Sequence, residues 1–343
     1  MKRISELQKK PLFKTFPFKT ILAVLATGML AYLLAKTDLK LLWAHLRQLP
    51  LPIMLLLIAL QLLTQLALNY QWYRLCKSLN MKTSFFRLLV ANSYGVIADA
   101  ITPGEKVGGE VVRVVQLKRM LGYGTGQSAS LTAIQKSISI FALVLLNIAA
   151  LAALSGRIGF LQAAAAKTVL ILILAALALF LLSMVFYTDK INSFMQRLPF
   201  NGKTARGIKK WMMGFASDTK QISSQPKRWI FQLLLSFGIW ALFPMKLFIL
   251  VSQYTVVNIF VLYAVTFISY FAAMIPILPG GLGTFEGTMS GLLLVYGLTP
   301  EEAVAVSLVF RFVTFWFVVL LSAAVILLWK LLSYIRKKEY GFE

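Results

Sequence analysis

The sequence is poor in the residues from which most catalytic and metal centres are built. It contains one cysteine, Cys76, and one histidine, His45. A single cysteine excludes an internal disulfide and any multi-cysteine metal site. His45 lies in a polar connection, and no acidic cluster of the DxD kind is present to hold a metal or a nucleotide. We therefore expect no metal, no cofactor and no catalytic residue.

Acidic residues are also scarce. The chain has 12 Asp and Glu residues and 35 Lys and Arg residues, which gives a net charge of +23. In a soluble protein this excess would suggest a nucleic-acid partner, but here the basic residues flank apolar stretches. Hydrophobic residues make up 59% of the chain and charged residues 14%, which excludes an ordinary soluble domain. We predict an all-α polytopic membrane protein with no nucleic-acid partner, whose basic residues orient the spans.

One short motif occurs twice, as PGEKVGGE at 103–110 and PGGLGTFE at 279–286. Each copy places a glutamate seven residues after the proline of a Pro-Gly pair. The match continues on both sides, with one deletion, and pairs Ser93 with Ser269, Tyr94 with Tyr270, Gly122 with Gly297, and Lys136 with Arg311. We interpret this as an internal duplication, with repeat A at about 51–154 and repeat B at about 228–330.

The apolar stretches fall into two kinds. Two of them, 85–121 and 257–297, are interrupted by the Pro-Gly motif, and each half is too short to cross the membrane alone. We predict that both are re-entrant helical hairpins, which are tolerated only where protein or a water-filled cavity satisfies the broken backbone. The others are long enough to span, since crossing takes about 20 helical residues. The six expected spans are 19–36, 51–73, 127–154, 158–187, 228–252 and 301–330.

Basic residues cluster in three segments that we place in the cytoplasm: the N-terminus at 1–18, a connection at 188–227 and a tail at 333–343. The first hairpin must then return to the side from which it entered, because a single crossing would place the central connection outside. The two hairpins therefore enter from opposite faces, in an inverted-topology repeat typical of alternating-access transporters. We predict a single transmembrane domain at 19–332 in the inner or plasma membrane, with both termini cytoplasmic.

Five ionisable residues are candidates for a substrate-binding or coupling site. Glu110 and Glu286 stand in apolar surroundings, where a charge is costly and is either paired or functional. One interpretation is a capping or salt-bridge role at the hairpin tip, and the other is proton exchange during transport. Lys136 and Arg311 could pair with these glutamates, within or across the repeats. Together with Arg113, they could instead bind a lipid phosphate, for which the planar guanidinium is well suited.

Two further features are weaker candidates. Asp99 precedes the first break, but its counterpart in repeat B is Ile275, and Lys246 lies in an apolar span without an evident partner. Glycines at the breaks allow a sharp turn and leave backbone N–H groups free to bind an anion. The predicted hairpin breaks are Pro103, Gly104, Pro279, Gly280, Gly281 and Gly283.

At these motifs the chain resembles the flippase-like membrane domain of the lysylphosphatidylglycerol synthases. The resemblance rests on PGEKVGGEVVRVVQLKRMLG, on PILPGGLGTFEGTMSGLLLVYGL and on AVSLVFRFVTFW, and it covers about residues 18 to 332. In this family a Glu-Arg pair usually stands where this chain has Gln135-Lys136, so the basic charge is kept and the acid is lost. Family members with a soluble aminoacyl-transfer domain extend beyond the position of Glu343. The resemblance therefore implies lipid translocation without lysyl transfer.

The expected function is flipping of an anionic phospholipid or a polyprenyl-phosphate-linked intermediate between leaflets, with proton coupling as one option. The partners would be membrane lipids or a lipid-linked glycan, and a homo-oligomer is left open. We expect no enzymatic activity. Two alternatives remain: a membrane-embedded transferase acting on a lipid phosphate, and a proton-coupled antiporter of a small cation.

Overall fold

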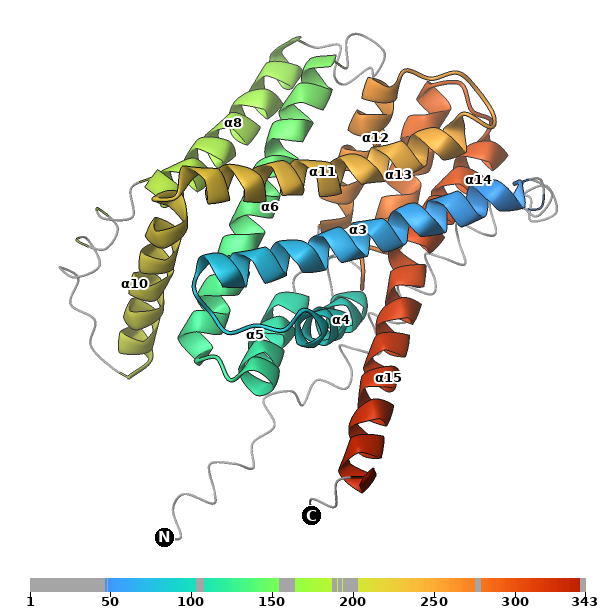
Figure 1. Cartoon of the computed structure of the whole chain (residues 1–343). Helices are drawn as coiled ribbons and strands as arrows, with labels where there is room; N and C mark the ends of the chain where they lie inside the picture. The colour runs from blue at the N-terminus through green and yellow to red at the C-terminus, as the bar shows by residue number, and fades with distance from the viewer. Residues whose placement is uncertain are drawn as a thin grey trace.

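Helices form the regular secondary structure in the part of the chain that the computed structural model describes (Figure 1). That part comprises residues 47, 49–102, 108–153, 164–186, 190, 193, 203–274 and 279–339. The expected N-terminal segment 1–18, the expected span 19–36 and the break at Pro103 and Gly104 lie outside the described residues. The predicted class, an all-α polytopic membrane protein, is confirmed.

The described helices follow one another along the chain in numerical order. They are α3 (Leu51–Ser78), α4 (Phe85–Ile101), α5 (Gly108–Leu121), α6 (Thr125–Ala153), α8 (Ala164–Phe186), α10 (Lys203–Ser223), α11 (Pro226–Val251), α12 (Ile259–Met274), α13 (Thr284–Val295), α14 (Pro300–Arg311), the π-helical turn η1 (Phe312–Trp316) and α15 (Phe317–Glu339).

Within the described residues, four helical segments are long and apolar enough to cross a membrane. They are α3, α6, α11 and the continuous run from α14 through η1 into α15. The starts of three of them are set by proline, whose fixed φ suits the first helical turn: α3, α11 and α14 each carry one there. Thr299 and Glu302 add a capping box at the start of α14. These spans agree with the stretches expected from the sequence.

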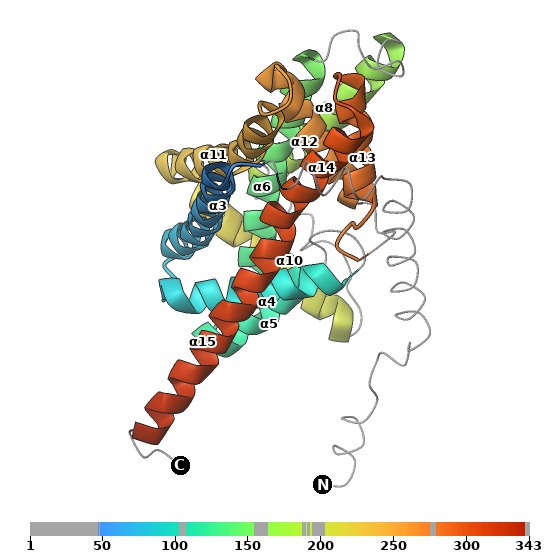
Figure 2. The ribbon, with the colours of Figure 1, turned by 90° about the vertical axis from the view of Figure 1, so that its right-hand side faces the viewer.

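The predicted interruption of two apolar stretches is also confirmed. α4 packs against α5, and α12 packs against α13, so each interrupted stretch is a helical hairpin. At 1.5 Å per residue the 17 residues of α4 reach about 25 Å, which is less than the hydrocarbon thickness. Figures 1 and 2 show the α4–α5 hairpin at the lower end of the molecule and the α12–α13 hairpin at the upper end.

Equivalent residues of the two repeats adopt the same local structure. Gly122 and Gly297, which follow α5 and α13, have φ angles of 74° and 94°, a region that favours glycine. Ser93 and Ser269 each donate a hydrogen bond to the carbonyl four residues earlier, at 2.8 and 2.7 Å. These paired positions therefore share a helix ending and a side-chain contact, while the duplication itself stays a prediction.

An aromatic cluster fills the core between α11, α12, α13 and α14. Tyr270 lies at its centre, with ring centroids 5.9 Å from Trp240, 5.3 Å from Phe243 and 5.0 Å from Phe285, all in edge-to-face geometry. Phe285 stacks in turn on Phe310 at 5.9 Å. Such offset and perpendicular contacts are the favoured arrangements of aromatic rings. The cluster fixes Trp240, Phe243 and Tyr270 as one wall of the candidate site.

Candidate functional site

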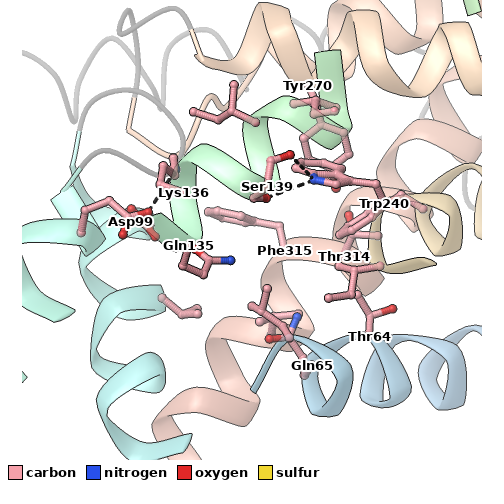
Figure 3. A pocket seen from close by; sticks show the side chains of 18 of the residues that line it. Thr64, Gln65, Asp99, Gln135, Lys136, Ser139, Trp240, Tyr270, Thr314 and Phe315 are labelled. Atoms are coloured by element: carbon pink, nitrogen blue, oxygen red, sulfur yellow. Dashed lines mark hydrogen bonds and ion pairs between the residues drawn. The ribbon is translucent and has the colours of Figure 1, made fainter. Parts of the chain in front are cut away.

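A cavity of about 140 Å³ is lined by residues of α3 to α6 together with residues of α11, α12, η1 and α15. The first hairpin and α6 form its polar end, where Asp99 and Lys136 lie (Figure 3). Trp240 and Tyr270 lie at the opposite end, and the indole N–H of Trp240 donates to the carbonyl and hydroxyl oxygens of Ser139 at 3.1 Å. The cavity therefore has a charged end and an aromatic end, as a ligand with an ionic head and an apolar body requires.

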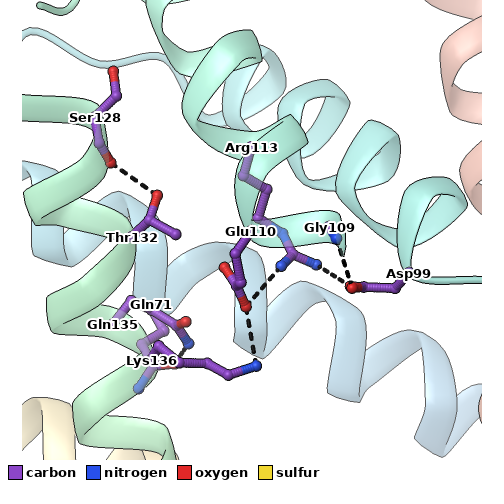
Figure 4. A network of polar contacts seen from close by, with 9 residues as sticks. All are labelled: Gln71, Asp99, Gly109, Glu110, Arg113, Ser128, Thr132, Gln135 and Lys136. Carbon is purple, nitrogen blue, oxygen red and sulfur yellow. Dashed lines mark hydrogen bonds and ion pairs between the residues drawn. The ribbon is translucent and has the colours of Figure 1, made fainter. Parts of the chain in front are cut away.

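The charged end is a chain of alternating acids and bases (Figure 4). Lys136 Nζ lies 3.0 Å from Glu110 Oε1, and Arg113 Nη1 lies 3.0 Å from the same oxygen. The other end of the guanidinium, Nη2, lies 3.0 Å from Asp99 Oδ2. Because two acids face two bases, the network carries no net charge, and Arg113 is held by carboxylates on both sides.

Two glycines make this network possible by allowing close approach. The backbone N–H of Gly109 donates to Asp99 Oδ1 at 2.8 Å, and a Cβ at Gly109 would collide with that carboxylate. A Cβ at Gly95 of α4 would likewise collide with the Arg113 side chain. Gly95 in α4 and Gly109 at the start of α5 therefore leave room for Arg113 and Asp99 between the two helices of the hairpin.

Only one of the two carboxylate oxygens of Glu110 contacts its basic partners in the described part of the chain. Both cations contact Oε1, whereas Oε2 is buried and has no hydrogen-bond partner among the described residues. Its side chain is 21% exposed and that of Lys136 is 27% exposed, while that of Arg113 is 10% exposed. Glu110 and Lys136 are therefore the members of the network most accessible from the cavity.

The equivalent pair in repeat B lies outside the cavity lining. Arg311 Nε lies 3.3 Å from Glu286 Oε1, and the two side chains are 1% and 6% exposed. Glu286 Oε2 also accepts a hydrogen bond from the Gly283 backbone N–H at 2.6 Å, which closes a capping box at the start of α13. Phe315 lines the cavity and packs on the Arg311 guanidinium at 4.1 Å. An aromatic ring thus lies between this arginine and the cavity.

The tips of the two hairpins meet. The backbone N–H of Gly280 in the second break donates to the carbonyl of Thr102 at the end of α4, at 3.2 Å. On the other side of the same peptide segment, the Gly280 carbonyl accepts a hydrogen bond from Arg311. A Cβ at Gly280 would lie 2.6 Å from the Phe315 ring. Arg311 and Phe315 therefore hold the second tip against the first. Phe315 belongs to η1, and π-helical turns of this kind occur frequently at functional sites.

The structure thus separates the five residues that the sequence singled out. Glu110, Arg113 and Lys136 line one cavity, whereas Glu286 and Arg311 form a buried pair behind Phe315. Each acid pairs with the base of its own repeat, which the sequence had left open. Of the predicted breaks, Pro279, Gly280, Gly281 and Gly283 lie in the turn between α12 and α13.

Polar residues inside apolar spans also belong to the site, in addition to the five residues predicted from the sequence. Asp99 belongs to the charged network, and Gln135 Nε2, next to Lys136, donates to Gln71 Oε1 of α3 at 3.1 Å. Thr64 and Gln65 of α3 also line the cavity. In the sequence, these residues are indicated by the recurrence of Gln, Thr and Asn along one otherwise apolar span, 51–73.

A fully buried lysine lies behind the cavity wall. Lys246 of α11 is 0% exposed and donates to Gln61 Oε1 and, at 3.1 Å, to Thr64 Oγ1. Its Nζ also lies 4.4 Å from the centre of the Phe243 ring. No salt bridge joins it to an acid in the described part of the chain. Since Thr64 and Phe243 both line the cavity, Lys246 is one residue layer away from it.

The apolar spans, paired hairpins and enclosed charged network define an all-helical polytopic membrane protein with a polar site inside its helix bundle. The chain belongs to the lysylphosphatidylglycerol synthase TM region family, whose model matches residues 20–322. This confirms the resemblance predicted from the motifs.

Archaeal membrane proteins are among its relatives. The chain is 26% identical over 289 residues to the UPF0104 membrane protein PH1989 of Pyrococcus horikoshii, covering 80% of this chain and 86% of the relative. It is 27% identical over 143 residues to a UPF0104 membrane protein of Methanothermobacter thermautotrophicus, covering 39% of this chain and 42% of the relative.

Proposed function

We propose that this protein moves the phosphate-bearing headgroup of an anionic phospholipid or polyprenyl-phosphate-linked intermediate between leaflets, through the central cavity. The observation that carries the proposal is the cavity itself, which has Arg113 and Lys136 at one end and aromatic rings at the other. The tail of the lipid would remain in the bilayer. Membership of a family named for a lipid synthase supports a lipid substrate.

Binding would proceed by exchange of anions at Lys136. In the structure a single oxygen of Glu110 contacts both cavity cations. A phosphate that displaces Glu110 offers Lys136 and Arg113 several acceptor oxygens, and Arg113 can form a bidentate contact with them. Asp99 keeps Arg113 oriented during this exchange, because it contacts the opposite edge of the guanidinium.

A proton on Glu110 would make this exchange favourable. With Glu110 neutral, the network of two acids and two bases gains one positive charge, which an incoming monoanionic headgroup balances. The buried Oε2 atom, which has no hydrogen-bond partner in the described part of the chain, is the position where the proton would reside. Headgroup binding would thus be coupled to proton uptake, with no covalent chemistry.

The second pair would have a different role. Glu286 caps α13 and fixes Arg311, which in turn holds the tip against Thr102. We assign this pair to the closed contact between hairpin tips and not to the substrate. In an inverted-topology repeat, rocking of one hairpin against the other would open the cavity to alternate sides, and the tip contact would break in each cycle.

The test is transbilayer movement of headgroup-labelled phosphatidylglycerol or a polyprenyl phosphate in liposomes, with and without a pH gradient. Wild-type protein should accelerate movement, and the gradient should change the rate. Glu110→Gln, which mimics the protonated state, should abolish the response to the gradient. An unchanged rate and gradient response in Glu110→Gln would contradict proton coupling at this residue.

The same assay separates the alternatives. Flux of a small cation without movement of any lipid would replace the flippase proposal with antiport. Conversion of the labelled lipid to a new product, detected by mass spectrometry, would replace it with group transfer. Phosphatidylcholine is the matched control. Its phosphate is neutralised by its own ammonium group, so Lys136 would attract this headgroup less strongly.

A further inference from the structure

A second cavity lies between the first hairpin and the last helix. It has a volume of about 490 Å³ and is lined by Tyr94 of α4, Gln116 and Arg119 of α5, and Trp329, Lys330 and Ser333 of α15. None of these residues lines the central cavity. α15 packs against α4, and both views show α15 passing beside the hairpin before its C-terminal end extends beyond it (Figures 1 and 2). We call this second cavity the α5–α15 groove.

The α5–α15 groove is equipped to bind an anion. Its two cations, Arg119 and Lys330, are exposed, and neither makes a salt bridge within the described residues. No carboxylate lines the groove. Tyr94 and Gln116 can donate further hydrogen bonds from a hydroxyl and an amide. Two cations on separate helices, together with neutral donors, match the oxygens of a phosphate diester.

Apolar rows lead into the groove along both helices. On α5, Val111 and Val115 are 68% and 55% exposed and lie two turns and one turn, respectively, before Arg119 on the same helix face. On α15, Leu327 and Leu331 are 65% and 55% exposed and flank Lys330. In a membrane protein such surfaces contact acyl chains. A ligand that fits this groove therefore has an anionic head with chains attached, and Trp329 is suited to the level of the headgroups.

We propose that the α5–α15 groove binds the headgroup of an anionic phospholipid of the leaflet nearest the C-terminal end of α15, with its chains along the two apolar rows. A free phosphate would use the cations but not the rows, so a lipid is the occupant that the surroundings favour. The site is separate from the central cavity, and the inference does not rest on translocation.

The test is a titration of the detergent-purified full chain with dioctanoyl phosphatidylglycerol, with bound lipid counted by native mass spectrometry. The double variant Arg119→Gln/Lys330→Gln should lose about 25-fold in affinity at this site, because each basic residue near anionic lipid contributes roughly fivefold. The control is Lys118→Gln/Lys227→Gln, which removes the same charge from exposed positions outside the groove. It should retain affinity within about threefold.

Parallel titrations identify the occupant and keep the two sites apart. In a Lys136→Met background the groove should still bind one phosphatidylglycerol, whatever the fate of the central cavity. Dioctanoyl phosphatidylcholine should bind more weakly, and glycerol phosphate should not compete at matched concentration. Equal losses in both double variants, equal binding of the two lipids, or competition by glycerol phosphate would each overturn the proposal.

Discussion

Replacing Gly281 with alanine should destabilise the second hairpin, because this glycine has a φ of 68° and lies against the backbone of α12. An added Cβ would lie 2.7 Å from Ala273 Cβ and 2.8 Å from its carbonyl oxygen. The left-handed conformation costs an alanine about 1–2 kcal/mol. Forcing atoms into this packed contact costs roughly another 1–3 kcal/mol. We expect the free energy of unfolding to fall by about 2–5 kcal/mol in total.

Gly287 of α13 provides the matched control, since a Cβ there meets no atom within 4 Å. Gly287→Ala should stabilise the helix by about 0.5–1 kcal/mol, because alanine loses less backbone entropy than glycine. Thermal unfolding of both variants in the same detergent measures the difference. The melting temperature should fall by on the order of 10 °C for Gly281→Ala and rise by about 1–3 °C for Gly287→Ala. Equal shifts in the two variants would refute the described turn.

Three further substitutions test separate parts of the account. Lys246→Met should raise the free energy of unfolding by about 1–3 kcal/mol, and with it the melting temperature, since it removes a buried charge that is contacted by neutral groups in the described part of the chain. A lower melting temperature would contradict this. Glu286→Gln should cost about 3–5 kcal/mol, because it leaves its fully buried arginine partner uncompensated, and unchanged stability would count against a structural role. To test the topology, a cysteine introduced at Thr299 should react with an impermeant thiol reagent added from outside, and a cysteine introduced at Lys227 should not. Cys76 should give no background, because it is 0% exposed. The reverse labelling would overturn the inverted repeat.

The helices and their interruptions could be predicted because their causes are local in sequence. The length of each apolar stretch predicts whether it can span the membrane, and the repeated Pro-Gly motif predicts where two of the stretches are interrupted. The distribution of basic residues predicts that the two hairpins enter the membrane from opposite faces. The structure places the hairpins at opposite ends of the molecule. Their orientation in the membrane stays a prediction. The repeated motif also indicated that Lys136 and Arg311 could pair with the two glutamates, and the structure shows the pairs Lys136–Glu110 and Arg311–Glu286.

The site itself could be predicted only in part, because its composition depends on how separate helices pack. Equal motifs suggested equal roles for Glu110 and Glu286, but Phe315 lies between the second pair and the cavity. By sequence Asp99 is a weaker candidate, because its counterpart in the second motif is Ile275; in the structure this acid, paired with Arg113, is what makes the first charged network the larger one. The meeting of the tips at Thr102 and Gly280 joins residues far apart in sequence, and no local pattern indicates it.

The central claim is that Lys136 binds a lipid phosphate in the cavity, and the most direct test is the rate of phosphatidylglycerol movement in liposomes for Lys136→Met. Lys118→Met is the control, since it removes the same charge from an exposed position on α5 outside the cavity. Because hydrogen bonds to charged groups contribute about 1.5–3 kcal/mol, the account predicts a loss of at least about tenfold for Lys136→Met and an almost unchanged rate for Lys118→Met. Equal rates in the two variants, with both proteins folded, would contradict it.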